Sequence, residues 1–144
     1  MDYKRKMREL IAKSEITDVV NAYFRAFGEK HFDAEYFSHV FVSSAQVTRP
    51  NGSPMIGTEN ISASHENSFT RFEGSKHLLT GRNVLIDGDS ATVRTNLVAM
   101  DVWNGSRTNA NAKDNFFIAG GVIRAELTLE GGQWKLSELS NIVV

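Results

Sequence analysis

Apolar residues recur at helical spacing through the first part of the chain, at steps of three and four. This pattern runs over Ile16, Val19, Val20, Tyr23, Phe24 and Phe27 and predicts an amphipathic helix. Met7, Leu10 and Ile11 form a shorter stripe ahead of it, and Ser14 is a candidate cap for a new helical turn. Gly28 follows the last apolar position and suits a helix end.

Two shorter helices are predicted further on, starting near Asp33 and at Thr58, which suits an N-cap. In the second of these, one face gathers residues at steps of four, four and three: Ile61, His65, Phe69 and Phe72. Between the two helices, residues 45–49 form a candidate short strand. The Pro- and Gly-containing segment 50–54 predicts a turn.

From residue 75 onward the pattern becomes that of strands. Strands are predicted at 76–86, 91–103, 116–129 and 134–144, with a tight turn at 87–90, a mobile polar loop at 104–115 and a bulge or sharp bend at Gly120-Gly121. Helices followed by hairpin-linked strands indicate an α+β fold with a mostly antiparallel sheet. Long strands with internal glycines tend to coil, so we expect the sheet to close over a helix as one domain spanning residues 1–144.

Composition excludes several classes of function. The 144 residues carry 16 basic and 17 acidic side chains, a net charge of −1 without a basic stripe, which disfavours nucleic acid as a partner. No apolar run is long enough to span a membrane. The chain has no cysteine, and its four histidines lack metal-site spacing. We therefore expect a cytoplasmic protein that uses no metal or cofactor and has no membrane partner.

Four local features together resemble one known family. They are the segment AYFRAF at 22–27, a histidine (His77) ten positions before Asp87, the hairpin IDGDSATV at 86–93, and the closing hairpin at 120–139 with its Gly-Gly-x-Trp turn. In this order they resemble the SnoaL-like branch of the nuclear transport factor 2-like superfamily, over roughly residues 8–143. The resemblance implies a cystatin-like cone, in which N-terminal helices pack in a strongly curved, mostly antiparallel sheet.

The same resemblance implies a pocket and a candidate catalytic histidine. The family includes scytalone dehydratase-like, polyketide cyclase-like and ketosteroid isomerase-like enzymes. A histidine matching His77 acts as a general base or acid in the dehydratase-like members, and its ordinary pKa near neutrality suits that role. Its alternative role is a histidine packed on the sheet and bonded to a carbonyl. Asp101, which shares strand parity with inward positions, and His65 are candidate assistants, with a solvated carboxylate and a buried structural histidine as their alternatives.

The resemblance also implies substrate-binding positions. Tyr23 matches a tyrosine that binds substrate oxygen in some relatives, and Asn83 shares parity with His77. The expected apolar pocket is lined by Val20, Phe24, Phe27, Phe37, Leu79 and Leu97. This set suits a cofactor-independent lyase or isomerase of the dehydratase or cyclase type, acting on a small apolar molecule that is cyclic or aromatic.

Gly28 leaves two other functions open. Relatives that eliminate water or chloride pair their histidine with an aspartate at the end of the first helix, and Gly28 stands at that place. A non-catalytic binding module with the same cavity is therefore one alternative. An accessory subunit like the β subunits of ring-hydroxylating dioxygenases is another. Relatives commonly form homodimers or homotrimers, and symmetric assembly is the default expectation here.

Overall fold

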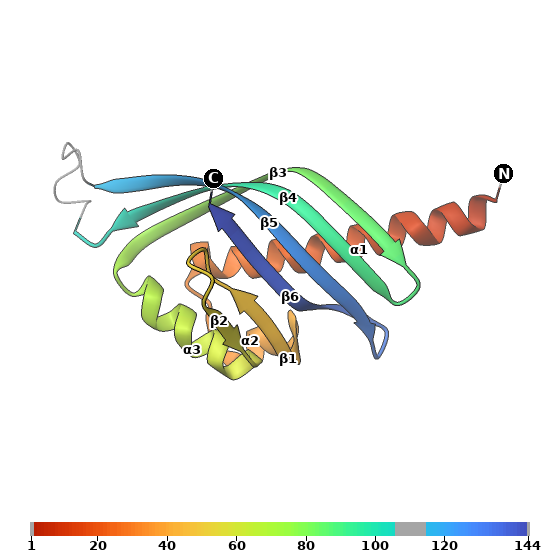
Figure 1. The fold of residues 1–144 in the computed structure, drawn as a ribbon, viewed down its shortest axis with the longest axis horizontal. Coiled ribbons are helices and arrows are strands. Elements are labelled where there is room, and N and C mark those ends of the chain that lie inside the picture. Colours follow the sequence, from red (N-terminus) through yellow and green to blue (C-terminus); the bar gives the residue numbers. More distant parts are fainter. Residues whose placement is uncertain (1, 106–114, 144) are drawn as a thin grey trace.

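The computed structural model describes residues 2–105 and 115–143, which form three helices and one six-stranded sheet. The elements are α1 (Tyr3–Glu29), α2 (Ala34–Ser38), β1 (Phe41–Thr48), β2 (Pro54–Ile56), α3 (Thr58–Phe69), β3 (Phe72–Asp87), β4 (Ser90–Trp103), β5 (Phe116–Glu130) and β6 (Gln133–Val143). The strands lie in the order β2-β1-β6-β5-β4-β3 (Figure 1). Neighbours are antiparallel except β1 and β6, which run parallel. The fold is therefore α+β with a mostly antiparallel sheet, as predicted.

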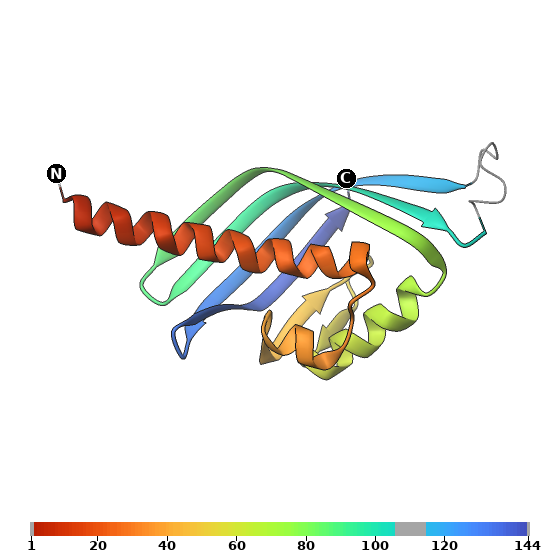
Figure 2. The ribbon, with the colours of Figure 1, turned by 180° about the vertical axis from the view of Figure 1, so that it is seen from behind.

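The sheet curves around α1, and this arrangement creates the core. The C-terminal half of α1 lies along the concave face, while α2 and α3 close one end of the molecule (Figure 2). Along β4, inward and outward positions alternate between buried and exposed, as a half-buried strand requires. Several of the largest side chains in the core are fully buried between the helices and the sheet: Ile16, Phe37, Phe41, Ile123 and Leu136.

α1 is one continuous helix, so the predicted break at Ser14 is wrong. Ser14 lies exposed within the helix, and the N-cap is Asp2, whose carboxylate accepts the Arg5 N–H at 3.0 Å. The helix continues through Gly28 to Glu29. Lys30, not a glycine, takes the left-handed conformation at its end, with φ of 54°, and its N–H bonds the Ala26 carbonyl. Within residues 2–105 and 115–143, no helix has the length and apolar character needed to cross a bilayer.

Other predicted boundaries also shift, each for a local reason. α3 has Gly57 as its N-cap, because the Thr58 hydroxyl donates instead to the Val42 carbonyl at 2.9 Å. Phe72 is not on that helix and begins β3. The first strand starts earlier than expected, and β2 was not predicted, because three residues are too few to show alternation. The tight turn between β3 and β4 is present, whereas residues 106–114 of the predicted loop lie outside the described residues.

Gly120 and Gly121 do not form a bulge, which is one of the two features predicted for them. Both pair in unbroken register with β4, opposite Val98 and Leu97. The register shifts instead between Thr80 and Asn83 in β3 and beside Leu127 in β5. Gly121 instead allows a close approach of β6. A Cβ at this position would lie 2.8 Å from the Ile142 carbonyl oxygen, so only glycine lets the two strands come this close. A Cβ at Gly120 would meet nothing within 4 Å.

These neighbouring glycines give a matched stability test. Gly121→Ala should lower the free energy of unfolding by about 1–3 kcal/mol, because a backbone carbonyl cannot move aside as a flexible side chain can. Gly120→Ala should change it by less than about 0.5 kcal/mol or raise it slightly. Urea unfolding of both variants would measure the difference, and equal midpoints would contradict the close approach described here.

Candidate functional site

A cavity of about 420 Å³ lies between α1, α3 and the concave face of the sheet. Aromatic rings make up much of its wall: Tyr23, Phe24, Phe27, Phe69, Phe72 and Phe117. Exposed residues Pro50, Asn51 and Arg71 also line it, so it opens to solvent at that end. A mostly apolar cavity with few polar groups is the usual form of a small-molecule site.

His77 reaches this cavity from β3. Its ring packs against Phe27 and Phe24 of α1, with centroid distances of 4.9 and 5.4 Å. The buried Nδ1 atom has no hydrogen-bond partner among the described residues. Burial lowers the pKa of His77 below its usual value, and the nearby Asp101 carboxylate partly opposes that shift by raising it. At neutral pH the ring is therefore an uncharged imidazole, which can accept a proton.

Asp101 lies beside His77 on the same face of the sheet. On β3 and β4, Ser75 stands opposite Asp101 and His77 stands opposite Ala99, so the histidine and the carboxylate are diagonal neighbours. Asp101 is buried and lines the cavity, and the Ser75 hydroxyl donates to its Oδ1 at 2.6 Å. The sheet therefore holds a carboxylate within electrostatic reach of the imidazole.

Tyr23 and His65 form a second polar pair in the cavity wall. The Tyr23 hydroxyl and His65 Nε2 share a buried hydrogen bond of 2.8 Å that joins α1 to α3. Burial lowers the pKa of His65 to about 4, with a smaller contribution from Arg49, and burial also raises the pKa of Tyr23. Both groups are therefore neutral at physiological pH. The Phe27 ring contacts His65, with a centroid distance of 5.1 Å, and also contacts His77. It therefore lies between the two polar pairs.

Gly28 approaches β3 outside the aromatic cavity. A Cβ at Gly28 would lie 3.4 Å from the Ser75 carbonyl oxygen, an ordinary contact that leaves room for a side chain. Gly28 and His77 together line a separate groove of about 390 Å³ between α1 and β3. A carboxylate at position 28 would therefore approach the strand of His77 from the helix side. In this chain the carboxylate that affects His77 comes from β4 instead.

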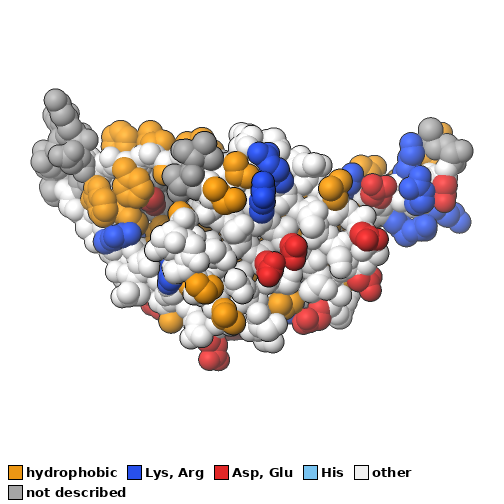
Figure 3. All heavy atoms as spheres, viewed as in Figure 1, with side chains coloured by type: hydrophobic (Ala, Val, Ile, Leu, Met, Phe, Trp, Pro, Cys, Tyr) orange, Lys and Arg blue, Asp and Glu red, His pale blue; other side chains and the backbone are white. Residues whose placement is uncertain are grey.

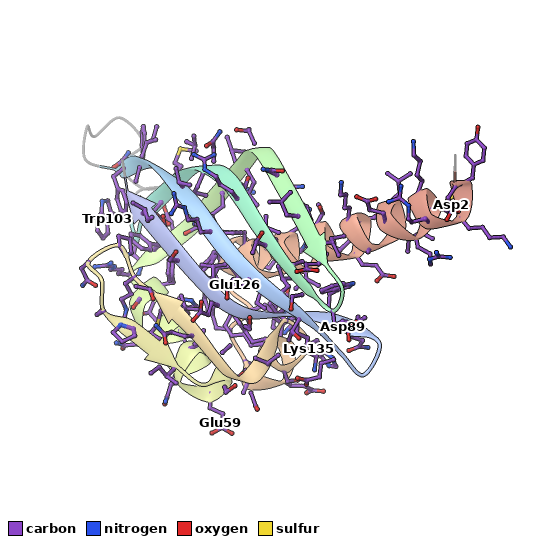
Figure 4. All side chains as sticks on the ribbon, turned by 45° about the vertical axis from the view of Figure 1, so that its right-hand side comes forward. Asp2, Glu59, Asp89, Trp103, Glu126 and Lys135 are labelled. Atoms are coloured by element: carbon purple, nitrogen blue, oxygen red, sulfur yellow. The ribbon has the colours of Figure 1, made fainter. Side chains whose placement is uncertain are left out.

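Some residues predicted for the pocket lie elsewhere. The prediction that Asn83 lines the pocket is wrong, because the extra residue at the register shift after Thr80 inverts the parity of Asn83. Asn83 instead lines a hollow of about 440 Å³ on the outer face, beside Arg94 and Glu126. Figure 4 shows Glu126 on that face. Val20, Phe37 and Leu97 are buried in the core and do not line the cavity, and Leu79 lines the α1–β3 groove. The outer hollow consists mainly of exposed residues, so the aromatic cavity is the better candidate site.

Asn141 and Arg49 line the cavity and were not predicted. The Asn141 Oδ1 atom is buried without a hydrogen-bond partner among the described residues. Arg49 donates to the hydroxyls of Ser53 and Ser64, which ties the β1–β2 turn to α3. Asn141 lies two positions after the inward Leu139, so strand alternation could have identified it. In the described residues, no three His, Cys, Asp or Glu side chains gather as a metal site would need.

Comparisons with known proteins agree with this architecture. The model of the SnoaL-like domain matches residues 8–140. No curated protein matches the chain. The structure is similar to a Kribbella flavida protein, Kfla4162, with 21% identity over 91% of this chain and 89% of that chain and a TM-score of 0.81.

Two further solved structures extend this likeness. A hexachlorocyclohexane dehydrochlorinase has 13% identity and a TM-score of 0.80, with 96% of this chain and 88% of that chain covered. A nuclear transport factor 2-like protein with a cystatin-like fold, from Novosphingobium aromaticivorans, has 19% identity and a TM-score of 0.76, with 98% and 87% covered. At such identities these structures show the fold, which is the predicted cystatin-like one.

The low pKa of His65 predicts how stability depends on pH. Below pH 6.5 the unfolded chain takes up a proton that His65 in the folded chain does not accept until about pH 4. Stability should therefore fall by about 3 kcal/mol as pH decreases from 6.5 to 4 on account of this residue. His65→Gln should remove that part of the decrease, while His39→Gln, at an exposed position, should keep the wild-type profile. Urea unfolding across this pH range measures the three profiles, and coincidence of all three would contradict the prediction.

Proposed function

Because the chain belongs to the SnoaL-like domain family, we propose that it is a cofactor-independent enzyme of the lyase or isomerase kind. Its substrate is a small apolar molecule, cyclic or aromatic, that carries at least one oxygen or other electronegative group. The aromatic cavity of about 420 Å³ is of a size that suits such a molecule. The dehydrochlorinase among the similar structures supports this class of reaction, because removal of a proton begins or accompanies such eliminations.

His77 is the proton-transfer group in this proposal, and its geometry is the observation on which the proposal depends. The ring reaches the cavity, is uncharged at neutral pH, and has a buried nitrogen without a partner among the described residues. A neutral imidazole packed against two aromatic rings can take a proton from a carbon of the bound molecule. The bond between that carbon and hydrogen breaks. Its electron pair forms either an enolate or a carbon–carbon double bond, and in the second case the bond from the neighbouring carbon to its hydroxyl or chloride breaks and that group leaves with the electron pair.

Asp101 acts on His77 as a positioning residue. When His77 gains a proton it becomes an imidazolium in an apolar wall, which is costly without a neighbouring negative charge. The Asp101 carboxylate supplies that charge, and the Ser75 hydroxyl holds one of its oxygens in place. In this chain the sheet provides what an aspartate at the place of Gly28 would provide from the helix.

Tyr23, oriented by His65, binds the electronegative group of the substrate. A pKa of about 4 makes His65 a poor proton donor at neutral pH, so we assign it to orienting Tyr23 and not to acid catalysis. With its proton on Nε2, His65 donates to the Tyr23 oxygen. The phenolic hydrogen is then available for a substrate oxygen. Tyr23 therefore polarises the substrate while His77 removes the proton.

A binding module without turnover is the second candidate function. The observation that favours it is Gly28, which brings no carboxylate to the point where α1 approaches Ser75; Glu29, which lines the same groove as His77, is exposed. In that case the cavity would bind the same apolar ligands, and His77 would contribute only a polar contact. Replacing His77 distinguishes these two functions, because only the enzyme loses a reaction.

Proton removal can be tested without knowing the product. The chain in D₂O would be incubated with a panel of β-hydroxy ketones, β,γ-unsaturated cyclic ketones and chlorinated cyclohexanes. Proton NMR then reports exchange, isomerisation or elimination. His77→Gln should lower the rate for an active compound by about 10²–10⁴-fold, the usual contribution of a positioned base. The exposed His39→Gln is the matched control and should keep full activity. An active compound whose rate is unchanged in His77→Gln would refute the role of His77.

The role of Asp101 predicts a change in the titration of His77. Asp101→Asn keeps the shape and a hydrogen bond to Ser75 but removes the negative charge, so the pKa of His77 should fall further below 6.5. The plateau rate should drop at least about tenfold, because the imidazolium loses its partner. Adding Gly28→Asp to this variant should raise the pKa again and recover part of the rate, since position 28 has room for a side chain.

NMR titration of the His77 ring protons measures the pKa independently of activity. Titration of Gly28→Asp alone is the control for a helix-side charge in the presence of Asp101. A His77 pKa that does not respond to Asp101→Asn would contradict the proposed coupling, even where the panel of compounds gives no active substrate.

A further inference from the structure

The first turns of α1 project beyond the sheet and expose an apolar stripe. Residues 2–11 are all exposed, and Asp2 lies at the far end of the helix, clear of the sheet (Figure 4). Four apolar side chains in this segment are between 52% and 74% exposed: Tyr3, Met7, Leu10 and Ile11. We call residues 2–13 the projecting arm. Large exposed apolar surfaces of this kind usually mark a site of interaction.

The helical phase of the stripe separates it from the chain's own core. At about 100° per residue, its centre lies roughly 150° around the helix from the centre of the buried face formed by Ile16, Val20 and Tyr23. A straight helix whose C-terminal half packs on the sheet therefore turns this stripe away from the sheet. One continuous helix cannot bury both faces against the same surface.

Basic side chains flank the stripe on both sides. Lys4 and Arg8 follow it around one side of the helix, and Lys6 and Lys13 lie on the other. The arm holds five basic and two acidic side chains, a net charge of +3, whereas the whole chain has −1. Glu9, one of the two acids, lies 3.4 Å from Lys13 and 4.0 Å from Arg5. Figure 3 shows the Lys and Arg side chains gathered at this end of α1.

We propose that the projecting arm binds the surface of a bilayer that contains anionic lipids, with its apolar stripe among the acyl chains. This proposal replaces the expectation from composition that the chain has no membrane partner. A surface that complements the stripe must be apolar at its centre and negative at both edges. A bilayer of anionic lipids offers that combination, and lysines beside a buried stripe extend towards the head groups. The helix is already formed in the structure, so binding does not bear the full cost of helix formation.

Charge disfavours a second copy of the arm as the partner. In an antiparallel pair, the stripe of one helix would face the stripe of the other. The charged positions beside that seam are Lys4, Lys6 and Lys13, so Lys6 of one helix would approach Lys13 of the other. Like charges across such a seam repel, and Glu9, the acidic residue near Lys13, is already shared between Lys13 and Arg5 of its own helix.

Vesicle co-sedimentation tests the proposal on the full chain. Binding should be measured on phosphatidylcholine vesicles with and without phosphatidylglycerol, at low and high salt. The wild-type chain should sediment with the anionic vesicles and be released by salt. The double variant Leu10→Gln, Ile11→Gln should bind at least about tenfold more weakly, because it loses two buried aliphatic side chains. Lys4→Gln with Lys6→Gln should lose the preference for anionic vesicles.

The outer face of the sheet provides a matched control. Leu78 is 62% exposed, close to the 64% of Leu10, so Leu78→Gln with Val98→Gln changes an equivalent apolar surface away from the arm. This control should bind vesicles as the wild type does, and circular dichroism should show all variants folded. Failure of the wild type to sediment with anionic vesicles would overturn the proposal. Loss of vesicle binding in the Leu78 and Val98 control alone would also overturn it. The same holds if light scattering shows a dimer that the Leu10 and Ile11 substitutions dissociate, while no variant binds vesicles.

Discussion

The packing of α1 against the concave face of the sheet is the contact on which the site depends. One helical turn and a half supplies Tyr23, Phe24 and Phe27, and these rings form the wall that separates the cavity from the core. Phe24 and Phe27 also hold the His77 ring by direct contact. A shift of this helix would therefore change the cavity and the setting of His77 together. The hydrogen bond between Tyr23 and His65 resists such a shift, because it joins α1 to α3 through a buried contact.

Much of this arrangement could be predicted from periodicity, because it lies on regular elements. Tyr23, Phe24 and Phe27 follow helical spacing, and Asp101 has the parity of inward positions in an uninterrupted strand, so their placement in the cavity wall follows from pattern alone. Asn83 could not be placed in this way. An extra residue beside Gly81, which has φ of 62°, reverses the alternation, and nothing in the local sequence shows where a strand will absorb such a residue.

The sequence also could not show which inward side chains reach the cavity. Periodicity identifies Val20, Phe37 and Leu97 as inward, and all three are buried, but it does not show which inward side chains meet a cavity and which meet one another. That distinction depends on the curvature of the sheet and on α2 and α3 at its end. The direction of the stripe on α1 could not be predicted either, because the apolar run at 7–11 and the run at 16–27 were assigned to separate helical segments. One unbroken helix places them on opposite sides.

The position of β3 at the edge of the sheet has a consequence for the cycle of a base. His77 borders both the cavity and the α1–β3 groove, and within residues 2–105 and 115–143 no further strand pairs with β3 on its outer edge. An imidazole that has taken a proton from a molecule in the cavity must release it before the next turnover. Here water in the α1–β3 groove can approach the His77 ring, so the free base can be regenerated before the product leaves the cavity.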